Sequence, residues 1–196
     1  MRERLPAEAK GPWKWQQLRS AAASQLPRGL GADRHPVLWL SMKPAPLHQL
    51  RQHAQASGIN PRRLIAAPYF QPIERFIAAM ACADLFLDTV GFGAGAIGVL
   101  ALNAGLPLLT LPADSFVSRM GASLCHSTGL DSLVAPDLAA YQERALELCQ
   151  RPSALQLLRD QLCQAPQDLP LFQQRRWVHD LVHLLESRLP EMRPTP

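Results

Sequence analysis

Residues 83–111 read ADLFLDTVGFGAGAIGVLALNAGLPLLTL, and the expected architecture of the chain can be built outward from this segment. The short apolar runs 83–88 and 107–111 have the length and composition of buried β-strands. Between them, residues 94–104 place apolar side chains three and four positions apart, which predicts a helix, and Gly105 follows as its closing residue. This order of strand, helix and strand predicts parallel strands joined by a right-handed crossover.

The same alternation continues on both sides of this segment. Further strands are predicted at 37–41 and 64–67, with a weak one at 132–135, and further helices at 46–57, 72–82 and 116–128. The predicted fold class is therefore α/β, with a Rossmann-like parallel sheet that carries helices on both faces. Three more helices, at 137–150, 152–163 and 173–188, are expected to pack outside the sheet.

Length and composition limit the classes of protein that fit. A chain of 196 residues with 47% hydrophobic and 18% charged residues suits one α/β domain, or half of a two-domain enzyme, and argues against disorder. We expect an N-terminal segment 1–36 with a helix at 13–25, a Rossmann-like domain with a helical tail at 37–189, and a frayed end at 190–196. The formal net charge of +4 is too small and too scattered to indicate a nucleic-acid partner.

Two features bear on the cellular compartment. The four cysteines have no CxxC spacing and lie in apolar or helical surroundings, so we expect buried, reduced thiols and a cytoplasmic protein without a signal peptide. Residues 89–113 carry no charge and are long enough to span a membrane. Their many glycines, Pro107 and the flanking Asp88 and Asp114 favour instead a buried helix followed by a buried strand, with no membrane partner.

The glycine-rich loop that follows residue 88 is the first candidate site. In an open parallel sheet, ligands bind beyond the carboxyl ends of the strands, and the predicted helix begins directly after this loop. Gly93, Gly95, Ala96 and Ile97 would then offer backbone N–H groups to a phosphate at the helix N-terminus. A glycine turn that packs a helix tightly on a strand needs no ligand, and this alternative stays open.

Residues 93–98, GAGAIG, also match the dinucleotide fingerprint, and Asp114 follows the next strand where an acid that binds ribose could lie. An NAD-binding domain is therefore a further alternative. At least two predicted strands precede this one, however, whereas a nicotinamide site normally uses the first strand of its sheet.

The loop 111–119 leads from the next strand into another helix. Ser115 or Asp114 is expected to cap that helix. Arg119 lies one turn inside it, where its guanidinium could reach an anion or a partner carboxylate at the strand ends.

Two other groups of residues carry weaker signals. His179 and His183 stand four positions apart on a predicted helix, but no HExxH motif or third ligand accompanies them, so packing or solvation is favoured over metal binding. Ser123, Cys125 and His126 are neighbours in sequence, but a nucleophilic site needs spatial geometry that adjacency does not supply.

Several blocks in the same order resemble the C-terminal half of the protein O-linked N-acetylglucosamine transferase family, including its SPINDLY-like bacterial members. The blocks are VLWL at 37–40, GINPRRLI at 58–65, ADLFLDT at 83–89, AGLP at 104–107, LPADSFVSRMGASL at 111–124 and LPLF at 169–172. The resemblance spans residues 37–188 and implies the C-terminal half of a GT-B fold. It implies UDP-N-acetylglucosamine as donor substrate, inverting transfer of the sugar to protein Ser or Thr, and neither a resident cofactor nor a metal. The backbone N–H groups of the glycine-rich loop would then stabilise the charge that develops on the departing UDP.

The family's contact residues are mostly replaced in this sequence. The His-Thr-Thr that contacts the diphosphate in the family aligns with residues 95–97, and the Asp for the ribose aligns with Leu100. The Glu-His pair near the uracil aligns with Arg75 and Phe76, and a nearby Lys aligns with Ile73. Three lost contacts of about 1 to 3 kcal/mol each predict weak UDP binding.

Lys10 lies about where the family places a Lys that neutralises the leaving diphosphate, with Lys14 or Lys43 as substitutes. Nothing in the chain resembles the family's tetratricopeptide array or the N-terminal half of the transferase. The implied partners are therefore a UDP-sugar and either an acceptor protein or the missing half. The alternative is an inactive binding or scaffolding module that kept the fold.

Overall fold

The computed structural model describes residues 38–40, 44–67, 71–164 and 168–189. The helix predicted at 13–25 and the candidate residues Lys10, Lys14 and Lys43 lie outside these ranges.

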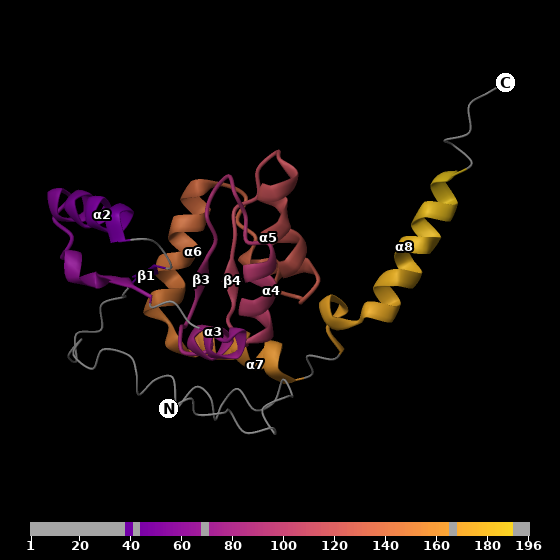
Figure 1. Ribbon diagram of the computed structural model, residues 1–196. Coiled ribbons are helices and arrows are strands. Elements are labelled where there is room, and N and C mark those ends of the chain that lie inside the picture. Colours follow the sequence, from indigo (N-terminus) through magenta and orange to yellow (C-terminus); the bar gives the residue numbers. More distant parts are fainter. Residues whose placement is uncertain (1–37, 41–43, 68–70, 165–167, 190–196) are drawn as a thin grey trace.

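The predicted parallel pairing is confirmed in two places. Strand β1 (Leu38–Leu40) pairs with β2 (Leu64–Ala66), and β3 (Phe86–Leu87) pairs with β4 (Leu108–Leu109), in both cases parallel. Helix α2 (Pro44–Ala56) and the short 3₁₀ helix η3 (Pro61–Arg63) connect the first pair, and α4 (Ala96–Asn103) connects the second. Helix α3 (Ile73–Met80) lies between the two pairs in sequence (Figure 1). The chain is thus an α/β protein.

The sheet is less extensive than the sequence suggests. The described strands form two two-stranded sheets instead of one continuous sheet, and each strand is two or three residues long. The weak strand predicted at 132–135 is represented by a single parallel bridge between Thr110 and Val134, next to the 3₁₀ helix η4 (Asp131–Leu133). Its two hydrogen bonds join the Thr110 N–H to Leu133 and the Ala135 N–H to Thr110, at 3.0 and 2.9 Å. Apolar composition predicts burial here, but too few backbone groups pair to form a strand.

Local capping explains where several helices begin and end. The Ser115 hydroxyl accepts from the Ser118 N–H at 3.2 Å and opens α5 (Phe116–His126), so of the two predicted caps Ser115 is the one used. Asp137 accepts from the Ala140 N–H at 2.8 Å and opens α6 (Leu138–Gln150). Gly105 follows α4 with a φ of +73°, in the left-handed region that favours glycine, which confirms its predicted role.

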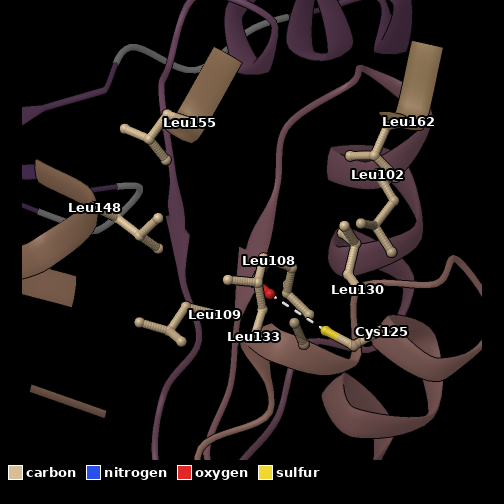
Figure 2. Close-up of a cluster of buried hydrophobic side chains, with 10 residues drawn as sticks. Leu102, Leu108, Leu109, Cys125, Leu130, Leu133, Leu148, Leu155 and Leu162 are labelled. Atoms are coloured by element: carbon tan, nitrogen blue, oxygen red, sulfur yellow. Dashed lines mark hydrogen bonds between the residues drawn. The ribbon is translucent and has the colours of Figure 1, made fainter. Parts of the chain in front are cut away.

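The main hydrophobic core is built around β4 and is rich in leucine (Figure 2). Its buried members come from the glycine loop, from α4, β4, α5 and η4 with the residue before η4, and from α6 and α7 (Pro152–Gln164): Ala94, Leu102, Leu108, Leu109, Cys125, Leu130, Leu133, Leu148, Leu155 and Leu162. The Cys125 thiol donates to the Leu108 carbonyl at 3.2 Å, so its one polar group is satisfied. Packing of this kind is the principal favourable contribution to folding of such a domain.

All four cysteines are free, but only part of the burial expected for them is found. Cys125 is buried and Cys82 is half-buried. The prediction was wrong for Cys149 and Cys163, which are exposed, because the buried positions next to them on α6 and α7 are taken by Leu148 and Leu162.

Residues 89–113 form the glycine loop, the eight-residue helix α4 and strand β4, which confirms the expected helix and the buried strand. Helix α4 buries one face only, through Gly98, Ala101 and Leu102. No helix in the described part of the chain has the length and apolar character needed to span a membrane.

The last helix, α8 (Gln174–Arg188), follows the 3₁₀ helix η6 (Pro170–Phe172) and projects away from the other elements (Figure 1). None of its residues is buried. Its exposed apolar side chains include Trp177, Val178, Leu181, Val182, Leu184 and Leu185.

Candidate functional site: the glycine loop beyond strand β3

A pocket of about 420 Å³ lies where β3 ends, between the glycine loop, the start of α4 and the first turns of α5. Most of its lining is apolar side chain or glycine backbone. The lining residues are Phe86, Leu87, Asp88, Thr89, Phe92, Gly93, Ala94, Gly95, Ala96, Ile97, Val117 and Met120. The predicted site residues Gly93, Gly95, Ala96 and Ile97 are thus brought together at one pocket, and its volume is within the usual range for small-molecule sites.

Gly93 does not supply the donor that the sequence suggested. Its N–H donates to the Val117 carbonyl on α5 at 3.1 Å, so this amide is already used within the protein. The approach is so close that a Cβ at position 93 would lie 2.6 Å from the same carbonyl oxygen. Gly93 therefore connects the loop to α5. This contact depends on how α5 packs against the loop, which the local sequence does not reveal.

The other three amides remain available. Gly95 is the N-cap of α4, and Ala96 and Ile97 form its first turn. Within the described ranges, no carbonyl or side chain accepts a hydrogen bond from these three N–H groups. Unpaired amides at the start of a helix favour an anion, because their partial positive charges point in the same direction. Phe92 is 72% exposed and Ile97 is half-exposed, and both line the pocket without filling it.

Asp88 is a pocket residue that the site prediction missed. It is only 4% exposed, and its Oδ2 accepts from the Thr110 hydroxyl at 2.7 Å. Burial raises the pKa of Asp88 above its ordinary value, while the Thr110 hydroxyl and the backbone amides of Ala94 and Thr89 oppose this rise. The signal that could have identified it is a single acid at the end of a strand, directly before a long uncharged run.

Two neighbours complete the surroundings of Asp88. The Tyr141 hydroxyl, from α6, donates to the Asp88 carbonyl at 2.9 Å. Burial, and to a lesser extent the charge of Asp88, raises the pKa of Tyr141 to about 12. Gly121 on α5 lies against the carboxylate, and a Cβ there would be 2.3 Å from Oδ2 and 2.5 Å from the Thr110 hydroxyl oxygen. The contact between Asp88 and Thr110 therefore requires glycine at position 121.

Arg119 is not part of the pocket. Its side chain is exposed and its Nη1 donates to the carbonyl of Asp114, five positions earlier. The guanidinium thus folds back on its own loop, and the role of Arg119 toward an anion at the strand ends stays a prediction. Asp114 is itself exposed and lies outside the pocket lining, so the acid required by the NAD alternative is not at the loop.

The positions aligned with the family's contact residues do not supply side-chain donors to the pocket. Leu100 packs against the small core formed by Ile77, Met80 and their neighbours. Ile73, Arg75 and Phe76 are on α3 and do not line the pocket.

The weaker candidate sites are not supported. The Cys125 thiol is buried, and burial raises its pKa to about 12, so it is not a nucleophile at neutral pH. His126 instead pairs with Asp131 at 2.5 Å on the surface. Among the residues that the structure describes, no group of three or more His, Cys, Asp or Glu could hold a metal, and His179 is solvated on α8.

Comparison with known proteins identifies the family. The model of glycosyl transferase family 41 matches residues 30–181. A probable UDP-N-acetylglucosamine–peptide N-acetylglucosaminyltransferase, SEC, from Arabidopsis thaliana is 34% identical over 147 residues, which are 74% of this chain and 15% of that protein. The UDP-N-acetylglucosamine–peptide N-acetylglucosaminyltransferase of Caenorhabditis elegans is 27% identical over 150 residues, which are 76% of this chain and 13% of that protein. A probable SPINDLY transferase of Solanum lycopersicum is 25% identical over 164 residues, which are 82% of this chain and 18% of that protein.

A solved structure supports the fold. An O-GlcNAc transferase mutant from Thermobaculum terrenum superimposes with a TM-score of 0.65 at 23% identity, over 85% of this chain and 32% of that one. The chain spans between 13% and 18% of the lengths of the three relatives named above. On the family match and the shared α/β fold, this chain belongs to glycosyl transferase family 41.

Proposed function

We propose that this chain is the sugar-nucleotide half of a protein N-acetylglucosaminyltransferase, and that its pocket binds the diphosphate of a UDP-sugar. The donor would be UDP-N-acetylglucosamine, a substrate, and the chain would use neither a resident cofactor nor a metal. The acceptor would be a Ser or Thr hydroxyl of a protein, presented by parts of a longer transferase or by a partner.

The observation that carries this proposal is the set of free amides at Gly95, Ala96 and Ile97, which open into a pocket at the strand end. Three aligned N–H donors can stabilise the negative charge on a leaving nucleoside diphosphate without any positively charged side chain. The described lining of the pocket contains no Lys, Arg or His. We therefore expect UDP to bind through the backbone and with low affinity.

The test is a calorimetric or NMR titration with UDP, together with a variant that removes one donor. Ala96 is the first residue of α4, where proline is tolerated because the N–H it lacks has no partner within the helix. Ala96→Pro is expected to weaken UDP binding about tenfold, since one hydrogen bond to a charged group is lost.

Phe116→Pro is the matched control. Phe116 is the first residue of α5, is 74% exposed and lies outside the pocket lining, so the same change there should leave UDP affinity unchanged. The proposal is overturned if millimolar UDP produces neither a heat of binding nor a change in the NMR spectrum of the wild-type protein. A submicromolar affinity would contradict the reliance on backbone amides alone.

A second candidate function is a binding module that kept the fold and lost catalysis. Exposed apolar side chains near the pocket favour it, since Val90, Phe92 and Phe116 are each more than half exposed. This candidate predicts a folded protein in which the NMR chemical shifts of the loop amides do not change when UDP is added. The same titration therefore distinguishes the two functions.

A further inference from the structure

The glycine loop begins at a residue that is held from several directions. The Asp88 N–H donates to Leu109 of β4 at 2.9 Å, its carbonyl accepts from Tyr141 of α6, and its carboxylate accepts from Thr110. Inside the loop, the Thr89 hydroxyl donates to the Phe92 carbonyl at 2.6 Å. Near the far end of the loop, the Gly93 N–H donates to Val117 of α5, so the two ends of the loop are tied to different parts of the fold.

We propose that Asp88 is a positioning residue for the glycine loop. Its carboxylate is bonded to Thr110 and faces the amides of Thr89 and Ala94, and so holds both ends of the loop. This keeps the N–H groups of the three residues after Ala94, at positions 95–97, available to the pocket. The proposal rests on the proposed function, because the position of the loop matters for transfer only if the loop binds a diphosphate.

The carboxylate is difficult to explain as a device for stability. Removing an acid from water without a cationic partner is unfavourable, and the raised pKa of Asp88 reflects that cost. Gly121 adds a second restriction, because a Cβ at this position would lie 2.3 Å from Oδ2 and 2.5 Å from the Thr110 hydroxyl oxygen. The fold thus accepts a buried acid, and a glycine that leaves room for it, at the one position from which the loop starts.

Two substitutions at Asp88 separate positioning from charge. Asp88→Ala removes the acceptor for the Thr110 hydroxyl and for the loop amides. Asp88→Asn removes the charge but keeps the geometry, because its oxygen can accept from the loop amides while its NH₂ donates to Thr110. Asp84→Ala is the control, since Asp84 is an exposed acid just before β3 and outside the pocket.

The experiment measures amide hydrogen exchange of residues 89–94 by NMR in the free protein, and UDP affinity in the same samples. In Asp88→Ala we expect loop exchange about tenfold faster and UDP binding about tenfold weaker, while core amides keep their protection. In Asp88→Asn both should return to wild-type values, or UDP should bind more tightly because a negative charge has been removed.

The proposal is overturned if Asp88→Ala leaves loop exchange unchanged, or if Asp88→Asn is as defective as Asp88→Ala. If Asp88→Ala does not fold, Thr110→Val removes one hydrogen bond with little change in shape, and unchanged loop exchange in that variant also overturns the proposal. If the wild-type protein does not bind UDP, the proposed function is refuted, while the hydrogen-exchange data still decide the role of Asp88.

Discussion

Arg159 on α7 and Ala81 at the end of α3 lie 78 positions apart, yet the guanidinium Nη1 of Arg159 donates to the Ala81 carbonyl at 2.9 Å. Nη2 of the same side chain donates to the carbonyl of Ala83. Arg159 is buried, and its guanidinium satisfies the Ala81 carbonyl at the C-terminal end of α3, where positive charge is favourable, together with the Ala83 carbonyl beyond that end. This contact joins the helical tail to the α3–β3 connection.

Arg159→Met is therefore expected to lower the free energy of unfolding by about 2 to 3 kcal/mol, because a buried and a partly buried carbonyl lose a charged donor. Urea unfolding followed by circular dichroism measures this loss. Arg151→Met is the matched control, since Arg151 is 68% exposed and its bond to Glu147 is a surface ion pair. That control should change stability by less than about 0.5 kcal/mol. Equal effects of the two changes would contradict the anchoring role of Arg159.

Gly121→Ala tests the close approach of α5 to the end of β3. The added methyl would overlap both Asp88 Oδ2 and the Thr110 hydroxyl, so we expect a loss of about 1 to 3 kcal/mol of stability. Ser123→Ala, an exposed position two residues further along the same helix, should change stability by less than about 0.5 kcal/mol. A fully stable Gly121→Ala variant would mean that the contact is looser than the structure indicates.

Thiol labelling should separate the cysteines by environment. At pH 8 an alkylating reagent is expected to modify the exposed Cys149 while leaving Cys125 unmodified in the native state. The Cys125 thiol is buried, bonded to Leu108 and ionises only near pH 12. Mass spectrometry after timed labelling reads this out, with labelling in urea as the positive control for Cys125. Rapid modification of native Cys125 would show that the core opens easily.

The pH dependence of stability should carry opposite contributions from two acids. The pKa of Asp88 is raised in the folded state, so its contribution is fully present below its ordinary pKa of 3.8 and is lost as pH rises through the folded value. Asp88→Asn should therefore be more stable relative to wild type at pH 7 than at pH 3.5. Tyr141 and Cys125 also interact with Asp88, but both have pKa values of about 12 and do not titrate in this window.

Asp131 provides the contrast. The His126 hydrogen bond lowers the pKa of this exposed acid, so its contribution is present above pH 3.8 and is lost as pH falls. Asp131→Asn should lose stability relative to wild type at pH 7 and lose little at pH 3. Urea titrations at several pH values compare the two variants. If the free energy of unfolding of Asp88→Asn and Asp131→Asn, relative to wild type, changes in the same way with pH, the assigned directions of the two pKa shifts are contradicted.

Features that depend on neighbouring residues were predicted well. Ser115 accepts from a backbone N–H three positions on, and Gly105 takes the left-handed conformation directly after its own helix, so short sequence signals suffice for both. The apolar spacing in 94–104 and the short apolar runs on either side gave the parallel β3–β4 unit. Ordered blocks of sequence gave the family, because many local matches in series are far more specific than any one of them.

The sequence alone thus determined the α/β class, the parallel pairing and the position of the glycine loop, since these follow from hydrophobic spacing, turn residues and family pattern. Only the tertiary structure decided which loop amides stay free, because the Gly93 N–H is taken by Val117 from a helix that follows in sequence. It also decided that Asp88 is buried against Thr110 and Gly121, and that Arg119 turns back to its own loop. These outcomes depend on how distant segments pack together, and backbone hydrogen-bond partners across such contacts leave no local trace in the sequence.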